Sequence, residues 1–186
     1  MITSTTKMTA RQFLNIGEDP PGVRLELVNG EVAVSPRPSL DHSYTLVRIA
    51  RILDAYIDEN DLGQLFTDVD TIFGEFDVRC PDLLFVRKNR LRLLKKKAVE
   101  VPPDLCIEVI SPTAAHIDRD DKFGQYREAG IPCYWIIDPI EKTFEAFELR
   151  KKAYVLVASG QRDTKVCAVP FPELQIHLTR IWRTSL

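Results

Sequence analysis

The sequence of 186 residues is poor in the features that mark secreted, membrane and metal-cluster proteins. It has only four cysteines, and no two of them form a C-x-x-C pair, so the spacing argues against a thioredoxin-like motif or a zinc site. No stretch approaches the roughly 20 apolar residues that a membrane-spanning helix needs, and the N-terminal MITSTTKMTARQF lacks the apolar core of a signal peptide. We therefore expect a cytoplasmic protein with reduced thiols and no membrane contact.

Several catalytic and nucleotide-binding motifs are also absent. Neither G-x-x-x-x-G-K-[ST] nor G-x-G-x-x-G occurs, so nothing supports nucleotide binding through those loops. The G-x-S-x-G motif of many serine hydrolases is missing. The histidines His42, His116 and His177 are far apart and form no H-E-x-x-H motif.

What the chain does have is the composition of an ordinary globular protein. Hydrophobic residues make up 45% and charged residues 28%, and the length fits one domain over residues 1–186. The 25 basic and 27 acidic residues give a net charge of −2, which excludes a uniformly basic protein but not a local basic patch.

Local patterns predict both helices and a hairpin. Alternating apolar residues on both sides of Asn29-Gly30 predict a β-hairpin with a two-residue turn. Apolar residues at spacings of three and four predict a helix from Asp41 to near Asn60. A short helix is predicted over residues 8–14, with Thr9 as its N-cap, and another over 114–129.

Strand patterns recur between and after these helices. They occur in the segments 64–73, 82–86, 104–111, 133–138, 143–149, 153–158 and 165–169. The last three are predicted to be antiparallel. Because helices alternate with strands, the sequence predicts an α/β domain with a mixed β-sheet flanked by helices and extra antiparallel strands.

Two acidic residues stand out because they lie in apolar strands. Glu108 lies within Leu105-Cys106-Ile107-Glu108-Val109-Ile110, and Asp82 opens Leu83-Leu84-Phe85-Val86. A buried carboxylate needs a compensating partner. Each residue taken alone fits a buried ion pair or an acid at a strand end. Together, at adjacent strand ends, the two carboxylates also suit a hard divalent cation.

A polar stripe follows on the predicted helix. Asp118, Lys122 and Tyr126 are spaced i, i+4, i+8 and therefore share one helix face. The stripe is either a solvated salt bridge or a means of directing Lys122 at the metal site, where it would polarise a phosphoryl group.

At these residues the sequence resembles a known family. Pro81-Asp82 followed by Glu108 resembles the PD-(D/E)xK nuclease pattern. The longer run PDLCIEVISPTAAHIDRDDKFGQYREAGIPCYWIIDP is similar to that of the Uma-type family of restriction-endonuclease-like proteins. The hairpin LELVNGEV and His42 also match that family.

The resemblance implies a restriction-endonuclease-like core and a Mg²⁺-dependent (or Mn²⁺-dependent) DNA endonuclease that forms a homodimer. It implies Asp82, Glu108 and the Val109 carbonyl as metal ligands. Lys122 would replace the strand lysine, because the position two residues after Glu108 is Ile110. The resemblance covers a core of about residues 10–180, and it also implies accessory roles for four residues: Glu26, His42, Asp118 and Tyr126. The residues themselves leave three alternatives open. Glu26 is otherwise a solvent-facing hairpin residue, His42 a cap of the long helix and Tyr126 a tyrosine at the edge of the core.

A basic segment offers a surface for nucleic acid. The residues 87–97 carry seven cations: Arg87, Lys88, Arg90, Arg92, Lys95, Lys96 and Lys97. Since this segment joins the Asp82 strand to the Glu108 strand, we expect it close to the candidate site and in contact with phosphates. The alternative is a solvated loop.

Two hypotheses for function follow. The first is a metal-dependent DNA endonuclease. The second is a non-catalytic member of the same fold that binds nucleic acid or a partner protein. A purely structural protein would bind neither metal nor DNA.

Overall fold

The computed structural model describes residues 7–17, 19–35, 38–111 and 120–184, and its centre is a six-stranded mixed sheet. The strand order is β10-β9-β8-β7-β6-β3. All neighbours are antiparallel except β7 and β8, which are parallel. The strand bounds are Gly63–Phe66 (β3), Leu83–Arg87 (β6), Leu105–Val109 (β7), Cys133–Asp138 (β8), Thr143–Arg150 (β9) and Ala153–Gln161 (β10). The predicted α/β architecture with a mixed sheet is confirmed.

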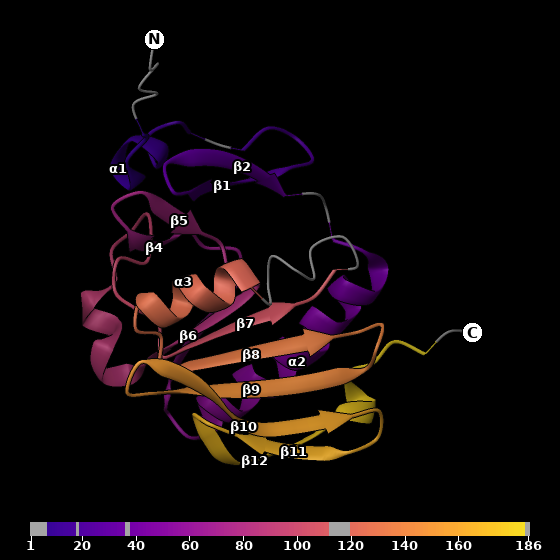
Figure 1. Ribbon diagram of the computed structural model, residues 1–186. Helices are drawn as coiled ribbons and strands as arrows, with labels where there is room; N and C mark the ends of the chain where they lie inside the picture. Colours follow the sequence, from indigo (N-terminus) through magenta and orange to yellow (C-terminus); the bar gives the residue numbers. More distant parts are fainter. Residues whose placement is uncertain (1–6, 18, 36–37, 112–119, 185–186) are drawn as a thin grey trace.

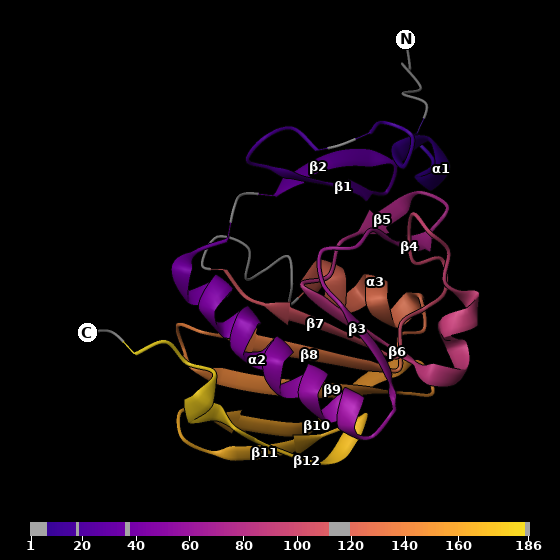
Figure 2. The same cartoon turned by 180° about the vertical axis from the view of Figure 1, so that it is seen from behind.

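A long helix and a two-stranded sheet cover one face of this sheet. Helix α2 (Leu40–Glu59) lies across that face, and β11 (Lys165–Ala168) with β12 (Phe171–His177) packs beside it (Figures 1 and 2). Ile49, Leu53 and Ile57 of α2 are buried in one core with alternate residues of the central strands. Ser39 caps the helix by accepting from the His42 N–H, which explains why the helix begins where it does.

The opposite face carries the short helix α3 (Lys122–Glu128). Tyr126 of α3 packs in a second core with Leu84, Cys106 and Tyr134, the strand residues that alternate with those of the first core. Helix α3 is capped by Ala129, and Gly130 follows with φ of +76°. Of the helix predicted over 114–129, residues 114–119 lie outside the described residues.

A second sheet of four strands lies beside the first (Figure 1). Its order is β2-β1-β5-β4, with bounds Arg24–Val28 (β1), Glu31–Ser35 (β2), Thr71–Gly74 (β4) and Asp77–Arg79 (β5). The hairpin predicted at Asn29-Gly30 is β1–β2, and both turn residues have positive φ, as a two-residue hairpin turn requires. Helix α1 (Ala10–Phe13) packs on this sheet, capped by Thr9 as predicted.

The single strand predicted over residues 64–73 was wrong. The chain forms β3 in the large sheet and β4 in the small sheet, with a turn at Asp68, whose φ is +57°. Apolar alternation continues across the turn, so the pattern alone does not show the break. The turn brings Thr67 and Asp68 to the candidate site.

Among the described residues, no helix is both long enough and apolar enough to cross a bilayer. Two short 3₁₀ helices also occur in the part of the chain that the structure describes, η1 (Lys88–Leu93) and η3 (Leu178–Arg180).

Gly63 gives a test of how β3 joins the sheet. A Cβ at this position would lie 2.1 Å from the Val86 carbonyl oxygen of β6. We expect Gly63→Ala to lower the free energy of unfolding by about 1–3 kcal/mol, as overpacking does, measured by urea denaturation. A matched control is Gly124→Ala in α3, where a Cβ meets nothing within 4 Å. That variant should gain roughly 0.5–1 kcal/mol from helix propensity, and equal effects at both positions would contradict the packing argument.

Candidate functional site

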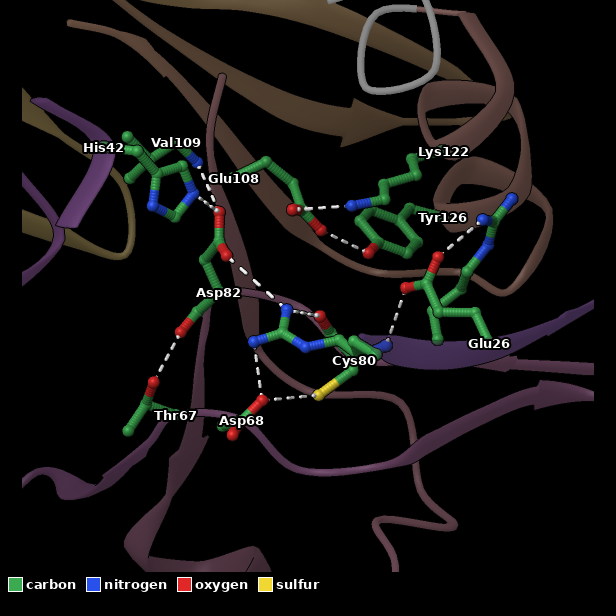
Figure 3. A network of polar contacts seen from close by, with 12 residues as sticks. Glu26, His42, Thr67, Asp68, Cys80, Asp82, Glu108, Val109, Lys122 and Tyr126 are labelled. Atoms are coloured by element: carbon green, nitrogen blue, oxygen red, sulfur yellow. Dashed lines mark hydrogen bonds and ion pairs between the residues drawn. The ribbon is translucent and has the colours of Figure 1, made fainter. Parts of the chain in front are cut away.

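The two acidic residues singled out by the sequence come together in the sheet. Leu83 pairs with Ile107 across the antiparallel β6–β7 ladder, so continuing the register by one residue places Asp82 opposite Glu108. Both side chains are buried, at 6% and 2% exposure. Alternation puts Glu108 on the α3 face, together with Cys106 and Ile110. Figure 3 shows the two carboxylates side by side.

Asp82 is held by groups from two other elements. Its Oδ2 lies 3.0 Å from Nε2 of His42 on α2 and accepts from the Val109 N–H at 2.8 Å. Its backbone carbonyl accepts from the Thr67 hydroxyl at 2.9 Å. Burial alone would raise the pKa of the Asp82 carboxyl, but the hydrogen bond and charge of His42, the Lys122 charge and the Val109 N–H lower that pKa below its ordinary value. Asp82 is therefore ionised at neutral pH, and His42 donates through Nε2.

Glu108 is held by helix α3. Lys122 Nζ lies 2.7 Å from Oε2, and the Tyr126 hydroxyl donates to Oε1 at 2.6 Å. Lys122 and Tyr126 are one helical turn apart, so both reach the same carboxylate. Burial and the adjacent Glu108 raise the pKa of Tyr126 well above its ordinary value, so its hydroxyl remains a donor. The predicted stripe thus faces the site rather than solvent. Its first member, Asp118, lies outside the described residues.

Glu26 occupies a neighbouring position with partners of its own. Its carboxylate accepts from Arg79 at 2.9 Å and from the Cys80 N–H at 3.1 Å. Arg79 also donates to Gln125 of α3, and Gln125 donates to Asp77. Glu26 therefore joins the hairpin, β5 and α3 into one polar network beside the carboxylate pair (Figure 3).

The sequence analysis missed Arg24. This residue lies two positions before Glu26 on β1, and its Nη1 is 3.8 Å from Asp82 Oδ1. Its Nη2 is 2.6 Å from Asp68, and the side chain is 32% exposed. Burial alone would lower the pKa of the Arg24 guanidinium, but Cys80 and the carboxylates of Asp68, Asp82 and Glu108 raise it. The alternation that puts Arg24 and Glu26 on one strand face was the available signal.

The basic segment does not lie where we expected it. Asp82 precedes β6 and Glu108 is near the end of β7, whereas the segment 87–97 leaves the other end of β6. Five strand residues place its first residue, Arg87, about 16 Å from the carboxylates, and Figure 1 shows η1 at the opposite end of β6 and β7. Beyond η1, Val99 forms a bridge with Thr71 at the start of β4. The error arose because connection in sequence was taken as nearness to the site.

Most cations of this segment already have acidic partners. Arg87 and Arg90 contact Asp104, Lys88 contacts Asp61 and Lys95 contacts Glu100. Arg92, Lys96 and Lys97 make no ion pair with any described residue and are exposed. These three cations are the ones left to meet an external anion.

The donor set fits a hard divalent cation of the Mg²⁺ type. Mg²⁺ is commonly bound through one or two carboxylates, with water and substrate phosphate oxygens completing its shell. Asp82 and Glu108 offer two adjacent carboxylates, and the contact that the described residues give Asp82 Oδ1 is the long one with Arg24. Among the described residues, no group of three or more His, Cys, Asp or Glu is arranged to hold a metal by itself. The site thus suits a cation that keeps water and substrate as ligands.

Comparisons with known proteins place this arrangement in context. The model of the family described as "Uma2: Putative restriction endonuclease" matches residues 10–179. A relative described as "Uncharacterized protein sll1609", from Synechocystis sp., is 26% identical over 129 residues, covering 68% of this chain and 72% of the relative. A crystal structure described as "a putative nuclease belonging to DUF820", from Anabaena variabilis, matches with a TM-score of 0.79 at 20% identity, covering 94% of this chain and 97% of that one. At this identity the structural likeness shows a shared fold.

The lowered pKa of Asp82 predicts how stability depends on pH. A carboxyl whose pKa is lower in the folded than in the unfolded chain stabilises the fold above its unfolded value, and that stabilisation is lost as pH falls through the folded value. We expect Asp82→Asn to be less stable than the wild type by about 1–3 kcal/mol at pH 7. The difference should shrink as pH falls below about 4. Urea denaturation across pH 2.5–7 measures this difference in the free energy of unfolding.

The control for this measurement is Asp58→Asn, which changes an exposed carboxylate of α2. The free energy of unfolding of this control should stay within about 0.5 kcal/mol of the wild-type value at every pH. A constant difference for Asp82→Asn over the whole range would contradict an ionised, stabilising Asp82.

Proposed function

Because the chain belongs to the Uma2 family of "Putative restriction endonuclease" proteins, we propose that it is a nuclease that hydrolyses DNA phosphodiester bonds with a divalent cation, Mg²⁺ or Mn²⁺. The observation that carries the proposal is the pair of buried carboxylates on adjacent strands, with Lys122 2.7 Å from one of them. Carboxylates and a cationic side chain at one point are what metal-assisted phosphodiester hydrolysis requires.

In this proposal, Asp82, Glu108 and the Val109 carbonyl hold the cation. The bound cation would lower the pKa of a water and neutralise charge on the phosphate. Lys122 places an ammonium beside Glu108 and stabilises the charge that develops on the phosphate oxygens. His42 and the Val109 N–H fix the orientation of the Asp82 carboxylate. Tyr126 fixes the orientation of Glu108.

The basic segment would act at a distance from the bond that is cut. Residues 87–104 contain seven basic and two acidic residues, a net charge of +5, whereas the rest of the chain has 18 basic and 25 acidic residues, a net charge of −7. Since the segment begins about 16 Å from the carboxylates, at Arg87, it would hold the DNA backbone away from the bond that is cut. We propose Arg92, Lys96 and Lys97 as the principal phosphate contacts.

One observation favours the second hypothesis, a member of the fold that binds without catalysis. Lys122 and Tyr126 already satisfy Glu108, and the acids on the hairpin side of the site would repel a phosphate. Burial and the nearby Asp19, Asp68 and Glu26 raise the pKa of Asp70, which shows how acidic that side is. The two hypotheses differ in whether the carboxylate pair binds a cation.

Calorimetric titration of Mg²⁺ and Mn²⁺, followed by incubation with supercoiled plasmid and single-stranded DNA, tests the proposal. We expect Asp82→Asn and Glu108→Gln to lose metal binding and at least about 100-fold of the cleavage rate. Lys122→Met should lose a similar share of the rate but bind metal at least as well, because Lys122 competes with the cation for Glu108.

The control is Glu173→Gln, which changes an exposed carboxylate on β12 and should leave both properties unchanged. Negligible metal binding by the wild type, equal to that of Asp82→Asn, together with no cleavage, would favour the non-catalytic hypothesis.

The role of the basic segment is tested by the salt dependence of DNA affinity. Each phosphate contact contributes a slope of about −0.9 in log K against log salt for duplex DNA. Replacing Arg92, Lys96 and Lys97 by Ala should therefore reduce the slope by up to about 3, measured by fluorescence anisotropy. The control replaces Arg11, Lys152 and Lys165, three exposed cations elsewhere, and changes the net charge equally. If both triple variants lower the slope alike, the segment has no special part in binding.

A further inference from the structure

The outer face of α2 carries apolar side chains that nothing in the described chain covers. Leu40, Tyr44 and Val47 follow one another at i, i+4 and i+7, and they are 74%, 40% and 66% exposed. We call these three residues the α2 stripe. They lie opposite the buried face of the helix, which includes His42, Ile49 and Leu53. Beyond Val47 the same face continues with Arg51 and Asp54, so the apolar surface is confined to the N-terminal half.

We propose that the α2 stripe packs against the α2 stripe of a second copy of this chain, antiparallel, around a two-fold axis beside Tyr44. In an antiparallel helix pair, residues at similar distances on either side of the axis face each other. Leu40, four residues before Tyr44, then lies across from Val47 of the second copy, three residues after it, and the two Tyr44 side chains meet near the axis. Exposed apolar patches of this kind mark interaction sites.

The charges beside the stripe match this arrangement and no parallel one. Asp41 and Arg48 are seven residues apart, so they lie on the same flank of the α2 stripe. In the antiparallel pair, Asp41 faces Arg48 of the second copy, and symmetry repeats this ion pair. In a parallel two-fold pair, this flank of one copy would instead lie across from the Ser43 and Ala50 flank of the other, so Asp41 and Arg48 would not meet.

The C-terminal segment holds both charges in position beside the stripe. Arg183 contacts Asp41 at 3.2 Å, and Arg48 donates to the Arg180 carbonyl at 2.8 Å. The opposite flank carries Ser43 and Ala50, whose small side chains allow a second helix to approach closely. The face is therefore complementary to itself in shape and in charge.

The homodimer expected from the resemblance stays a prediction, and this surface gives it a geometry. His42 lies on the buried side of α2, two residues from the proposed axis. The two carboxylate pairs would then lie on opposite sides of a helix pair, roughly 20–24 Å apart across two helix diameters. This inference rests on the surface of α2 and stands whether or not the site is catalytic.

Disulfide cross-linking tests the axis directly. The variant Tyr44→Cys is made in a Cys167→Ser background, because Cys167 is the exposed cysteine of the described chain. The two introduced thiols of this variant meet at the axis and should oxidise to give a covalent dimer. The control Asp54→Cys places its thiol on the same face of α2. The two copies of that thiol would be about 30 Å apart along the length of the helices, so they should stay reduced. Cross-linking of the control as fast as Tyr44→Cys, or of neither variant, would overturn the proposal.

A charge-reversal cycle checks the orientation independently. Analytical ultracentrifugation should show that Asp41→Arg and Arg48→Asp each weaken dimerisation by at least about 10-fold, and that the double variant recovers most of the loss. Val47→Glu should also favour the monomer, with circular dichroism confirming that each variant folds. A wild type that is monomeric at all concentrations, or a double variant weaker than both singles, would overturn the antiparallel arrangement.

Discussion

Two buried carboxylates lie next to each other on adjacent strands of the large sheet. The elements around that sheet supply the basic groups and hydrogen-bond donors that compensate their charge. Asp82 and Glu108 are opposed by the β6–β7 register, where unpaired charge would be costly. The three basic partners come from three different elements. His42 comes from α2, Arg24 from the hairpin and Lys122 from α3. Removing the carboxylates would therefore loosen the contacts of three peripheral elements with the central sheet.

The contacts that stabilise Asp82 and Glu108 in the interior also decide how readily each carboxylate could bind a cation. Glu108 accepts from Lys122 and Tyr126, so a cation that binds Glu108 has to displace or share these donors. Asp82 is different, because only Oδ2 is closely bonded and Oδ1 faces the long contact with Arg24. Arg24 is partly exposed, and its partner Asp68 is more exposed still. A ligand that approaches this cluster would therefore meet Asp68 and the Arg24 guanidinium first, before it reaches Asp82 or disturbs the buried pair of Glu108 and Lys122.

Local patterns in the sequence were enough to predict the elements that carry the site. Asn29-Gly30 indicated the hairpin, the apolar spacing indicated α2, and the acidic residue within an apolar strand indicated Glu108 in β7. The break at Asp68 was missed because apolar alternation continues through it, while tertiary contacts with Arg24 hold the turn. Arg24 was missed because its contact with Asp82 depends on how the hairpin lies against the large sheet. Alternation in β1 places Arg24 on the same strand face as Glu26, but it does not show what that face contacts.

The position of the basic segment follows from the direction of the two strands that it joins. When two strands pair antiparallel and are consecutive in the chain, the segment that joins them leaves the end of the first strand and enters the start of the second. A residue before the first strand, such as Asp82, and a residue near the end of the second, such as Glu108, must then lie at the other end. The separation of the basic segment from the carboxylates thus follows from strand direction alone. Such a fold can keep a strongly positive segment and a pair of buried acids apart in one small domain, so that the local field of one does not neutralise the other.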